Sequence, residues 1–319
     1  MLSRVADCLF WMSRYLERAE HIGRLLDVAF HTELDFAGLM PSGYAPPWQA
    51  VLGVLQQSAP PAALKASDPG KAIAHWLTFE IENPGSILAT INRARNNARS
   101  IRGTIGPEVW RAINNLYWQL RDTDFVARAK ESPHDYYQAV EAGSLLFQGV
   151  CDATLPHDEG WQFLQLGKYL ERADRTLRLL DIKREQLQSL TDPADLPLAG
   201  LEWASTLKSC RGFEAYQRLT IGRVESERVI GFLLLDAAFP RSVRFCLEEA
   251  AKALAGIEAP VGYRGETAVD KAIGRMLAEL RYADLPALLK DDFHGFMASL
   301  LLKCNAVSRA VQERYSLVN

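Results

Sequence analysis

Carboxylates and guanidiniums at helical spacing are the residues whose pattern most clearly indicates chemistry. Glu17, Glu20 and Arg24 fall on one face of a helix, because residues three and four positions apart are neighbours on a helix surface. A buried carboxylate can serve as a general base, since loss of water raises its pKa, whereas an arginine neighbour lowers that pKa and holds the carboxylate in an ion pair. Glu17 is therefore a candidate base, and Glu20 with Arg24 is a candidate ion pair.

The same charged segment occurs twice in the chain. Residues 15–28 read YLERAEHIGRLLDV and residues 169–182 read YLERADRTLRLLDI, which gives nine identities in fourteen positions at an offset of 154. The candidate site positions are Glu17, Arg18, Glu20 and Arg24 in the first copy and Glu171, Arg172, Asp174 and Arg178 in the second. Glu171 is accordingly the second candidate base.

The differences between the two copies favour burial of the charged face. His21 is replaced by Arg175, whereas the charged positions of the block keep their sign. A solvated face carrying ordinary i,i+4 pairs is the alternative, but it gives no physical reason for this selective retention, and a buried face does because each buried charge needs a partner. We therefore expect the two helices to meet across a pseudo-twofold axis, with Glu17 and Glu20 near Arg178 and with Glu171 and Asp174 near Arg24.

The repeat extends beyond this block. Trp48 recurs as Trp203 at offset 155, and Ser86 recurs as Ser242 at offset 156. A third match pairs Ser144-Leu145-Leu146 with Ser299-Leu300-Leu301. These matches predict two tandem repeat units, 1–155 and 156–319, which form one compact pseudo-symmetric bundle. Ser86 and Ser242 each follow a proline by two residues and are expected to cap equivalent helices.

Apolar residues recur with a period of 3.6 along almost the whole chain, without alternating β-branched runs, so the predicted fold class is all-α. The expected helices are 3–38, 47–57, 70–80, 86–104, 107–129, 134–154, 159–190, 200–219, 226–237, 241–256, 268–281 and 284–316. The prolines between Pro41 and Pro47 should break the chain, and Leu190 to Gly200 should form a loop.

Composition narrows the functional classes. Hydrophobic residues make up 48% of the 319 residues, and the net charge of −3 offers no general attraction to nucleic acid or anionic lipid. The five cysteines lack zinc-ligand spacing and are expected to be reduced, without disulfides. Charged residues interrupt the apolar start of the chain, and no run of eighteen apolar residues occurs, so we expect a soluble cytoplasmic protein without a membrane partner.

A second charged motif is the basic segment NRARNNARSIR at 92–102. Arg95, Arg99 and Arg102 are spaced to share one helix face, where three guanidiniums could clamp carboxylates or phosphates. The alternative is a solvated face or pairing with nearby acids. Nucleic-acid binding is not expected, because aromatic residues are not interleaved with these arginines in the sequence.

Several cofactor and metal motifs are missing. Glycine loops of the Walker or dinucleotide type do not occur, and neither copy of the block supplies the histidine of a Glu-x-x-His pair, so no cofactor and no metal site are expected. Asp122-x-Asp124 and Asp291-Asp292 resemble magnesium motifs of prenyl-transfer enzymes, but helix ends commonly carry such acids. Four histidines lack a recognisable Cys, Ser or Asp constellation. They are His75, His134, His157 and His294.

Three blocks together resemble the bacterial alpha-E family over essentially the full chain. They are SRVADCLFWMSRYLERAEHIGRLLDV, GVCDATLPHDEGWQFLQLGKYLERADRTLRLLDI and FLLLDAAFPRSVRFCL. The resemblance carries over the eight charged positions of the duplicated block and the arginine-rich helix with the following Trp110 and Asn114. It also implies partners: a circularly permuted ATP-grasp ligase and, near it, a transglutaminase-like protein and a proteasome-like peptidase.

The resemblance implies participation in an ATP-dependent peptide or amide-forming system. We expect this chain to be a helical accessory component that binds the ligase, an acidic or peptide substrate, or both, through the charged block and the Arg95 to Arg102 face. Two alternatives stay open. The chain is itself catalytic, with Glu17 or Glu171 as base, or it is a purely structural scaffold.

Overall fold

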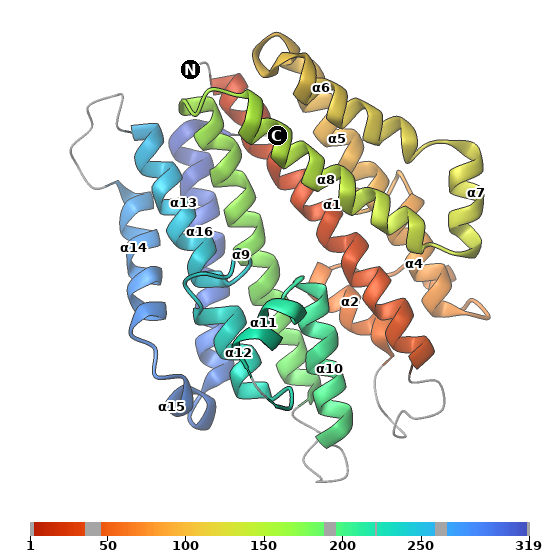
Figure 1. Cartoon of the computed structure of the whole chain (residues 1–319), viewed down its shortest axis with the longest axis vertical. Helices are drawn as coiled ribbons and strands as arrows, with labels where there is room; N and C mark the ends of the chain where they lie inside the picture. Colours follow the sequence, from red (N-terminus) through yellow and green to blue (C-terminus); the bar gives the residue numbers. More distant parts are fainter. Residues whose placement is uncertain (1–2, 36–45, 188–195, 221, 259–266, 318–319) are drawn as a thin grey trace. The chain divides into compact units, whose positions relative to one another are not determined.

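The computed structural model describes residues 3–35, 46–187, 196–220, 222–258 and 267–317. Within these residues the chain forms sixteen helices and no strand, which confirms the all-α prediction (Figure 1). The helices are α1 Ser3–Asp35, α2 Pro47–Leu55, α3 Pro61–Leu64, α4 Pro69–Phe79, α5 Ile87–Ser100, α6 Arg102–Gln119, α7 Thr123–Glu131, α8 His134–Thr154, α9 Glu159–Leu187, α10 Leu196–Ser209, α11 Phe213–Leu219, α12 Ser226–Leu235, α13 Val243–Glu258, α14 Ala268–Arg281, α15 Leu285–Lys290 and α16 Phe293–Tyr315.

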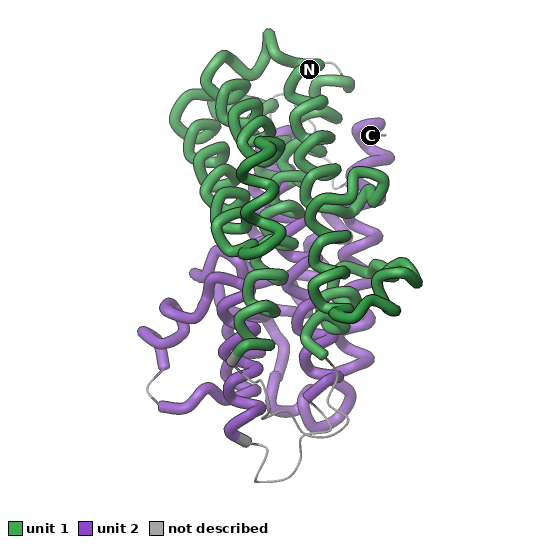
Figure 2. Tube along the Cα trace, turned by 90° about the vertical axis from the view of Figure 1, so that its right-hand side faces the viewer, with its two compact units in different colours: residues 1–167, 319 green, residues 168–318 purple. Residues whose placement is uncertain are grey.

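The chain divides into two compact units, which Figure 2 colours separately. Unit 1 comprises 1–167 together with the last residue, and unit 2 comprises 168–318. The division falls after Gly167, inside α9, whereas the repeat period places it after residue 155. No flexible linker is therefore needed at the boundary, because one helix carries the chain from the first unit into the second.

Unit 1 is built on a ring of four long helices. α1 packs against α5 and α8, and α6 packs against the same two helices, so the four enclose a common core. The side chains of Phe10, Ile22, Ile91 and Ile113 have one percent of their surface exposed or less. Such burial is the main source of stability in a helical bundle. α2 and α4 add to one side of α1, and α7 packs on α8.

Unit 2 contains a similar set of internal contacts. α14 packs against α13 and α16, and α12 packs against α10, α13 and α15. The α9 residues of this unit reach three of its helices or their leading turns. Thr176 donates a hydrogen bond to the carbonyl of Arg241, Lys183 contacts Glu202 of α10, and Arg178 contacts Asn305 of α16. The pseudo-twofold relation of the two units stays a prediction.

Two of the long helices expected from the sequence are each two helices, because an aspartate caps a new start. The expected helix 107–129 is interrupted where Asp122 accepts a hydrogen bond from the first turn of α7. The expected helix 284–316 is interrupted where Asp292 does the same for α16. Both acidic motifs therefore lie at helix ends, where such acids are common. Their carboxylates accept hydrogen bonds from backbone amides of the first helical turn that would otherwise lack partners.

A third expected helix, 200–219, is also two helices. Arg211 adopts a left-handed backbone conformation with φ of 52°, which ends α10 before Gly212 leads into α11. In contrast, the expected break before Pro107 is confirmed, since Gly106 has a φ of 73° and interrupts the helical path there. The proline-rich break between 41 and 47 falls mainly outside the described residues, as do residues 190–195 of the expected loop. The rest of that expected loop, residues 196–200, is helical, because α10 begins at Leu196 and not at residue 200.

Burial can be compared between helices of the two units. Buried positions of α13 match those of α5 at the expected offset of 156, with Ile87 and Val243 first in each helix. Most buried positions of α16 match those of α8 at offset 160, which pairs Ser144 with Cys304. The Ser-Leu-Leu match at offset 155 pairs positions of unlike burial, because Leu145 is 41% exposed and Leu300 is fully buried. The equivalence of the two units stays a prediction.

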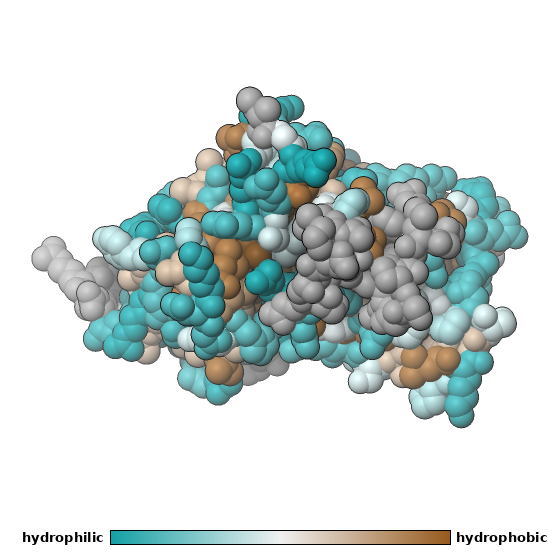
Figure 3. All heavy atoms as spheres, turned by 90° about the horizontal axis from the view of Figure 1, so that it is seen from below, coloured by the Kyte–Doolittle hydropathy of each residue, from teal (hydrophilic) through white to brown (hydrophobic). Residues whose placement is uncertain are grey.

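The surface and the cysteines are as the composition predicts. All five cysteines are buried thiols that form no disulfide in the part of the chain that the structure describes. The face seen in Figure 3 is mostly hydrophilic, with apolar residues exposed in separate patches. Over the part of the chain that the structure describes, each helix is either too short or too polar to span a lipid bilayer.

We predict that the two capping serines stabilise the fold to different degrees. Ser86 accepts a hydrogen bond from the amide of Ala89, so Ser86→Ala should lower the free energy of unfolding by about 1 kcal/mol. Ser242 caps α13 and also donates to the carbonyl of Asp236, so Ser242→Ala should cost more. Urea unfolding measures both changes. Ser100→Ala, at an exposed position, is the control, and equal losses in all three variants would contradict the assignment.

Candidate functional site

The charged block of α1 is buried, as expected, rather than solvated. The side chains of Glu17, Glu20 and Arg24 have 3%, 0% and 6% of their surface exposed. Glu20 is ion-paired with Arg24 one helical turn later and accepts a hydrogen bond from the Ser144 hydroxyl of α8 at 3.2 Å. The buried carboxylate therefore has a cationic and a neutral donor, which is the condition for keeping a charge away from water.

Glu17 accepts a hydrogen bond from the amide of Gln148 on α8 at 2.7 Å. Gln148 also lies 3.5 Å from Ser144, so the two α8 side chains that reach the block contact one another. This arrangement ties α1 to α8 through polar bonds inside an apolar layer. A base must be reachable by its substrate, and a carboxylate so enclosed and already hydrogen-bonded is better suited to a structural role.

The second block carries an equivalent set of pairs within unit 2. Arg178 binds Asp174 through two hydrogen bonds of 2.8 Å, matching the pair of Glu20 with Arg24. Arg175 donates twice to Glu171, at 2.8 and 3.0 Å. Arg175 stands at the position of His21 in the first block. Glu171, the second candidate base, is therefore bound by a guanidinium.

The remaining arginine of each block stacks on an aromatic ring. The Arg18 guanidinium lies 5.7 Å from the centre of the Tyr15 ring, and that of Arg172 lies 5.7 Å from the centre of the Tyr169 ring. Arg172 also donates to the carbonyl of Pro240 at 3.4 Å. Among the eight predicted positions, Glu20 pairs with Arg24 and Asp174 pairs with Arg178, whereas the other four contact residues outside the eight. The expected pairing of carboxylates in one unit with arginines of the other stays a prediction.

The arginine-rich segment is not the single three-arginine face that its spacing predicted. Arg95 is half-buried, donates to the Asn114 side chain at 2.9 Å, and lies 4.5 to 5.6 Å from the ring centres of Tyr117, Trp110 and Trp118. The guanidinium of Arg95 therefore joins α5 to α6. The family resemblance includes the arginine-rich helix, Trp110 and Asn114, and in the structure Arg95 of that helix contacts both of the other two residues.

Arg99 and Arg102 are exposed, and they belong to different helices. α5 ends at Ser100, and the backbone of Ile101 leaves the helical conformation, so Arg102 starts α6. Arg102 lies 5.3 Å from the centre of the Trp110 ring. Aromatic rings of α6 therefore lie beside Arg95 and Arg102 in space, although aromatic residues are not interleaved with the arginines in the sequence. Arg99, Arg102 and Trp118 are all exposed, and we call these three residues the Arg–Trp face.

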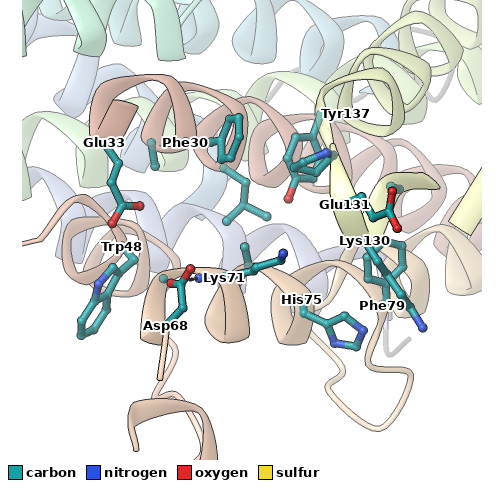
Figure 4. Close-up of a pocket in the computed structure, with 16 residues that line it drawn as sticks. Phe30, Glu33, Trp48, Asp68, Lys71, His75, Phe79, Lys130, Glu131 and Tyr137 are labelled. Carbon is teal, nitrogen blue, oxygen red and sulfur yellow. Dashed lines mark hydrogen bonds between the residues drawn. The ribbon is translucent and has the colours of Figure 1, made fainter. Parts of the chain in front are cut away.

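A pocket of about 280 Å³ lies in unit 1 among α1, α2, α4, α7 and the start of α8, and its lining includes none of the eight charged positions of the duplicated block. Figure 4 shows Glu33 and Asp68 beside Trp48 at one end, with Lys71 reaching toward the middle. The other end holds His75, Phe79, Lys130 and Glu131. Aromatic walls with separated charges of both signs suit a small ligand that is itself charged at both ends.

Burial and neighbouring charges adjust the groups around the pocket. The pKa of Glu33 is raised, chiefly by burial and further by the Asp68 carboxylate. The pKa of His75 is lowered, chiefly by burial and further by Lys130, so this imidazole is neutral at pH 7. On the buried side, loss of water raises the pKa of Tyr137 to about 12.

Sequence reasoning missed the histidine–aspartate pairs, two of which join residues far apart in the chain. His134, the first residue of α8, has Nδ1 2.8 Å from Asp27 Oδ1, and His294 on α16 has Nδ1 3.6 Å from Asp181 Oδ1. The expectation that these histidines lack an Asp constellation was wrong. Each pair joins residues more than a hundred positions apart. The available signal was the offset of 160 between His134 and His294, which the expected offset of 155 concealed.

Comparison with known proteins agrees with the two buried blocks. The family model described as "Alpha-E: A predicted alpha-helical domain with a conserved ER motif" matches residues 1–315. The chain belongs to the Alpha-E family. Glu17-Arg18 and Glu171-Arg172 are Glu-Arg pairs of the kind that this description names, and in each pair the glutamate is buried and the arginine stacks on a tyrosine.

Curated relatives of this Alpha-E chain include uncharacterized protein Mb2597 of Mycobacterium bovis and uncharacterized protein Rv2567 of Mycobacterium tuberculosis. Each is 28% identical over 337 aligned residues, which cover 97% of this chain but only 36% of the relative. The chain thus spans about a third of the length of the curated relatives it matches. No solved structure matches the chain.

We predict that the buried pair of Glu20 and Arg24 is essential for stability. Glu20→Ala removes one partner of a buried ion pair, and it should lower the free energy of unfolding by about 3–5 kcal/mol, measured by urea denaturation. Glu108→Ala is the matched control, because Glu108 pairs with Arg111 on the surface and should change stability by less than about 1 kcal/mol. Equal stability of the two variants would show that the block does not hold the core.

Proposed function

We propose that this Alpha-E protein is the helical, substrate- and partner-binding component of an ATP-dependent amide-forming system, and that its catalytic partner is a circularly permuted ATP-grasp ligase. The observation that carries the proposal is the unit 1 pocket, which places carboxylates and lysines around aromatic walls. A peptide or amino acid carries both an amine and a carboxylate. Glu33 and Asp68 are placed to receive the amine, and Lys71 to receive the carboxylate.

Two further features support an accessory role over an autonomous enzyme. Glu17 and Glu171, the candidate bases, are enclosed and occupied by Gln148 and Arg175, so a substrate would have to displace these donors. The curated relatives are almost three times as long as the part that this chain matches, which suits a component that works beside other protein parts. The Arg–Trp face is suited to docking, because arginine and tryptophan are enriched where proteins bind one another.

The pocket predicts binding of a zwitterionic peptide. L-alanyl-L-alanine, titrated into the protein in a calorimeter, should bind, and its N-acetylated, C-amidated analogue should not, because it lacks both charges. Lys71→Met keeps the length of the side chain but removes the charge, and it should weaken binding by about tenfold, or ~1.4 kcal/mol. Lys65→Met is the control at an exposed lysine outside the pocket. Unchanged affinity in Lys71→Met would exclude this binding mode.

The partnership predicts dependence on the ligase. The Alpha-E protein alone should release no ADP from ATP and form no amide product, whereas adding it to a circularly permuted ATP-grasp ligase should stimulate both. Arg99→Glu reverses a charge on the Arg–Trp face and should reduce the stimulation by about tenfold, while Arg275→Glu, an exposed site in unit 2, should leave it intact. Turnover by the Alpha-E protein alone would instead identify it as the enzyme. Absence of any stimulation would favour a scaffold.

A further inference from the structure

Three metal-ligating side chains meet where the end of α1 approaches the start of α8. Asp27 and His31 lie one turn apart on α1, and His134 is the first residue of α8. One donor atom from each residue lies within 4.8 Å of the donors of the other two. The ring centres of His31 and His134 are 5.3 Å apart, and the ring planes are inclined at 79°.

The hydrogen bonds of this cluster leave ligand atoms available. His31 Nδ1 lies 2.8 Å from the main-chain carbonyl of Asp27, an acceptor only, so Nδ1 carries the proton and Nε2 keeps its lone pair. A backbone carbonyl commonly orients metal-binding histidines in this way. His134 Nδ1 donates to the Asp27 carboxylate, and this proton leaves to solvent when a cation takes its place.

Exposure of the three side chains suits binding from solution. His31 and His134 have 51% and 46% of their side-chain surface exposed, whereas Asp27 has 16%. The carboxylate is thus held by the protein, and the two imidazoles line an open approach. A buried cluster of the same composition would need local opening before a hydrated cation could enter.

Unit 2 carries a modified version of the same cluster. Asp181 occupies the position of Asp27 at offset 154, and His294 on α16 approaches it to 3.6 Å, as His134 approaches Asp27. One turn after Asp181, however, Glu185 stands where unit 1 has His31. The aspartate and the histidine are therefore duplicated in space, while the third residue changes from one metal ligand type to another. If the aspartate and the histidine formed only a surface ion pair, neither His31 in unit 1 nor Glu185 in unit 2 would be needed beside them.

We propose that Asp27, His31 and His134 form a binding site for a divalent transition metal such as zinc. Two imidazoles and one carboxylate are the ligand set of many zinc and non-haem iron sites, in which three protein ligands leave positions for water or substrate. The site adjoins the pocket, because Phe30 and Pro133 line the pocket and precede His31 and His134 in the chain. A metal there would present an electrophile to a ligand entering from that side.

The test uses the purified full chain and zinc chloride, followed by calorimetry, with cobalt absorption reporting nitrogen ligands. The wild type should bind one zinc ion more tightly than any other. His31→Ala should weaken this binding at least about tenfold, and Asp27→Asn and His134→Ala should do likewise. Binding should also weaken on acidification, because metal binding displaces protons from its ligands.

The matched control is His157→Ala. His157 is 52% exposed and lies 3.6 Å from Asp152, so it repeats the exposed histidine–aspartate pair without a third ligand. This variant should keep the wild-type affinity. Zinc affinity that His31→Ala leaves unchanged, in protein with wild-type circular dichroism, would overturn the proposal, as would an equal loss in His157→Ala. Ligase activity plays no part, so the result is independent of the proposed function.

Discussion

Ionised side chains in the interior of each unit are the constraint on which the rest of the structure depends. Glu20 has no exposed surface, and Asp174 and Arg178 are almost as deeply enclosed. Taking such charges out of water costs several kcal/mol each unless partners replace the lost hydration. The core therefore tolerates only arrangements in which α8 delivers Ser144 and Gln148 to α1, and this fixes the rotation of α8 about its own axis. Everything else that α8 carries, including His134, is positioned by that requirement.

The sequence alone was sufficient for the local features. A 3.6-residue period identified the helices, and prolines and serines marked starts such as Ser86, because these signals depend on neighbours only a few residues away. Burial of the charged block could be predicted because the two copies keep the same charge sign at the same positions. The sequence was insufficient where a helix end depends on backbone detail. Ile101 leaves the helical conformation without any glycine or proline, and this moves Arg102 to a new helix, away from the face its spacing indicated.

Contacts between distant residues were the least predictable part of the candidate site. The rings that surround Arg95 come from the next helix, and the partners of Asp27 and Asp181 lie over a hundred residues later. A single repeat period does not supply these contacts, because matches along the chain fall at different offsets, from 154 in the charged block to 160 for the buried residues of α8 and α16. Burial depends on how a helix packs, whereas the matching letters Ser-Leu-Leu do not.

Positions along α1 separate stability from recognition. Its middle turns hold Glu17, Glu20 and Arg24 in the dry core, and its final turns carry Asp27, His31 and the pocket residue Glu33 toward solvent. Substitution in the middle is opposed by desolvation, so α9 retains the same charges there. Substitution at the open end meets no such penalty, and there α9 has Glu185 in place of His31. Duplication of a helix with this gradient preserves its core automatically and leaves the exposed end free to acquire a different ligand, so any functional difference between the units should reside there.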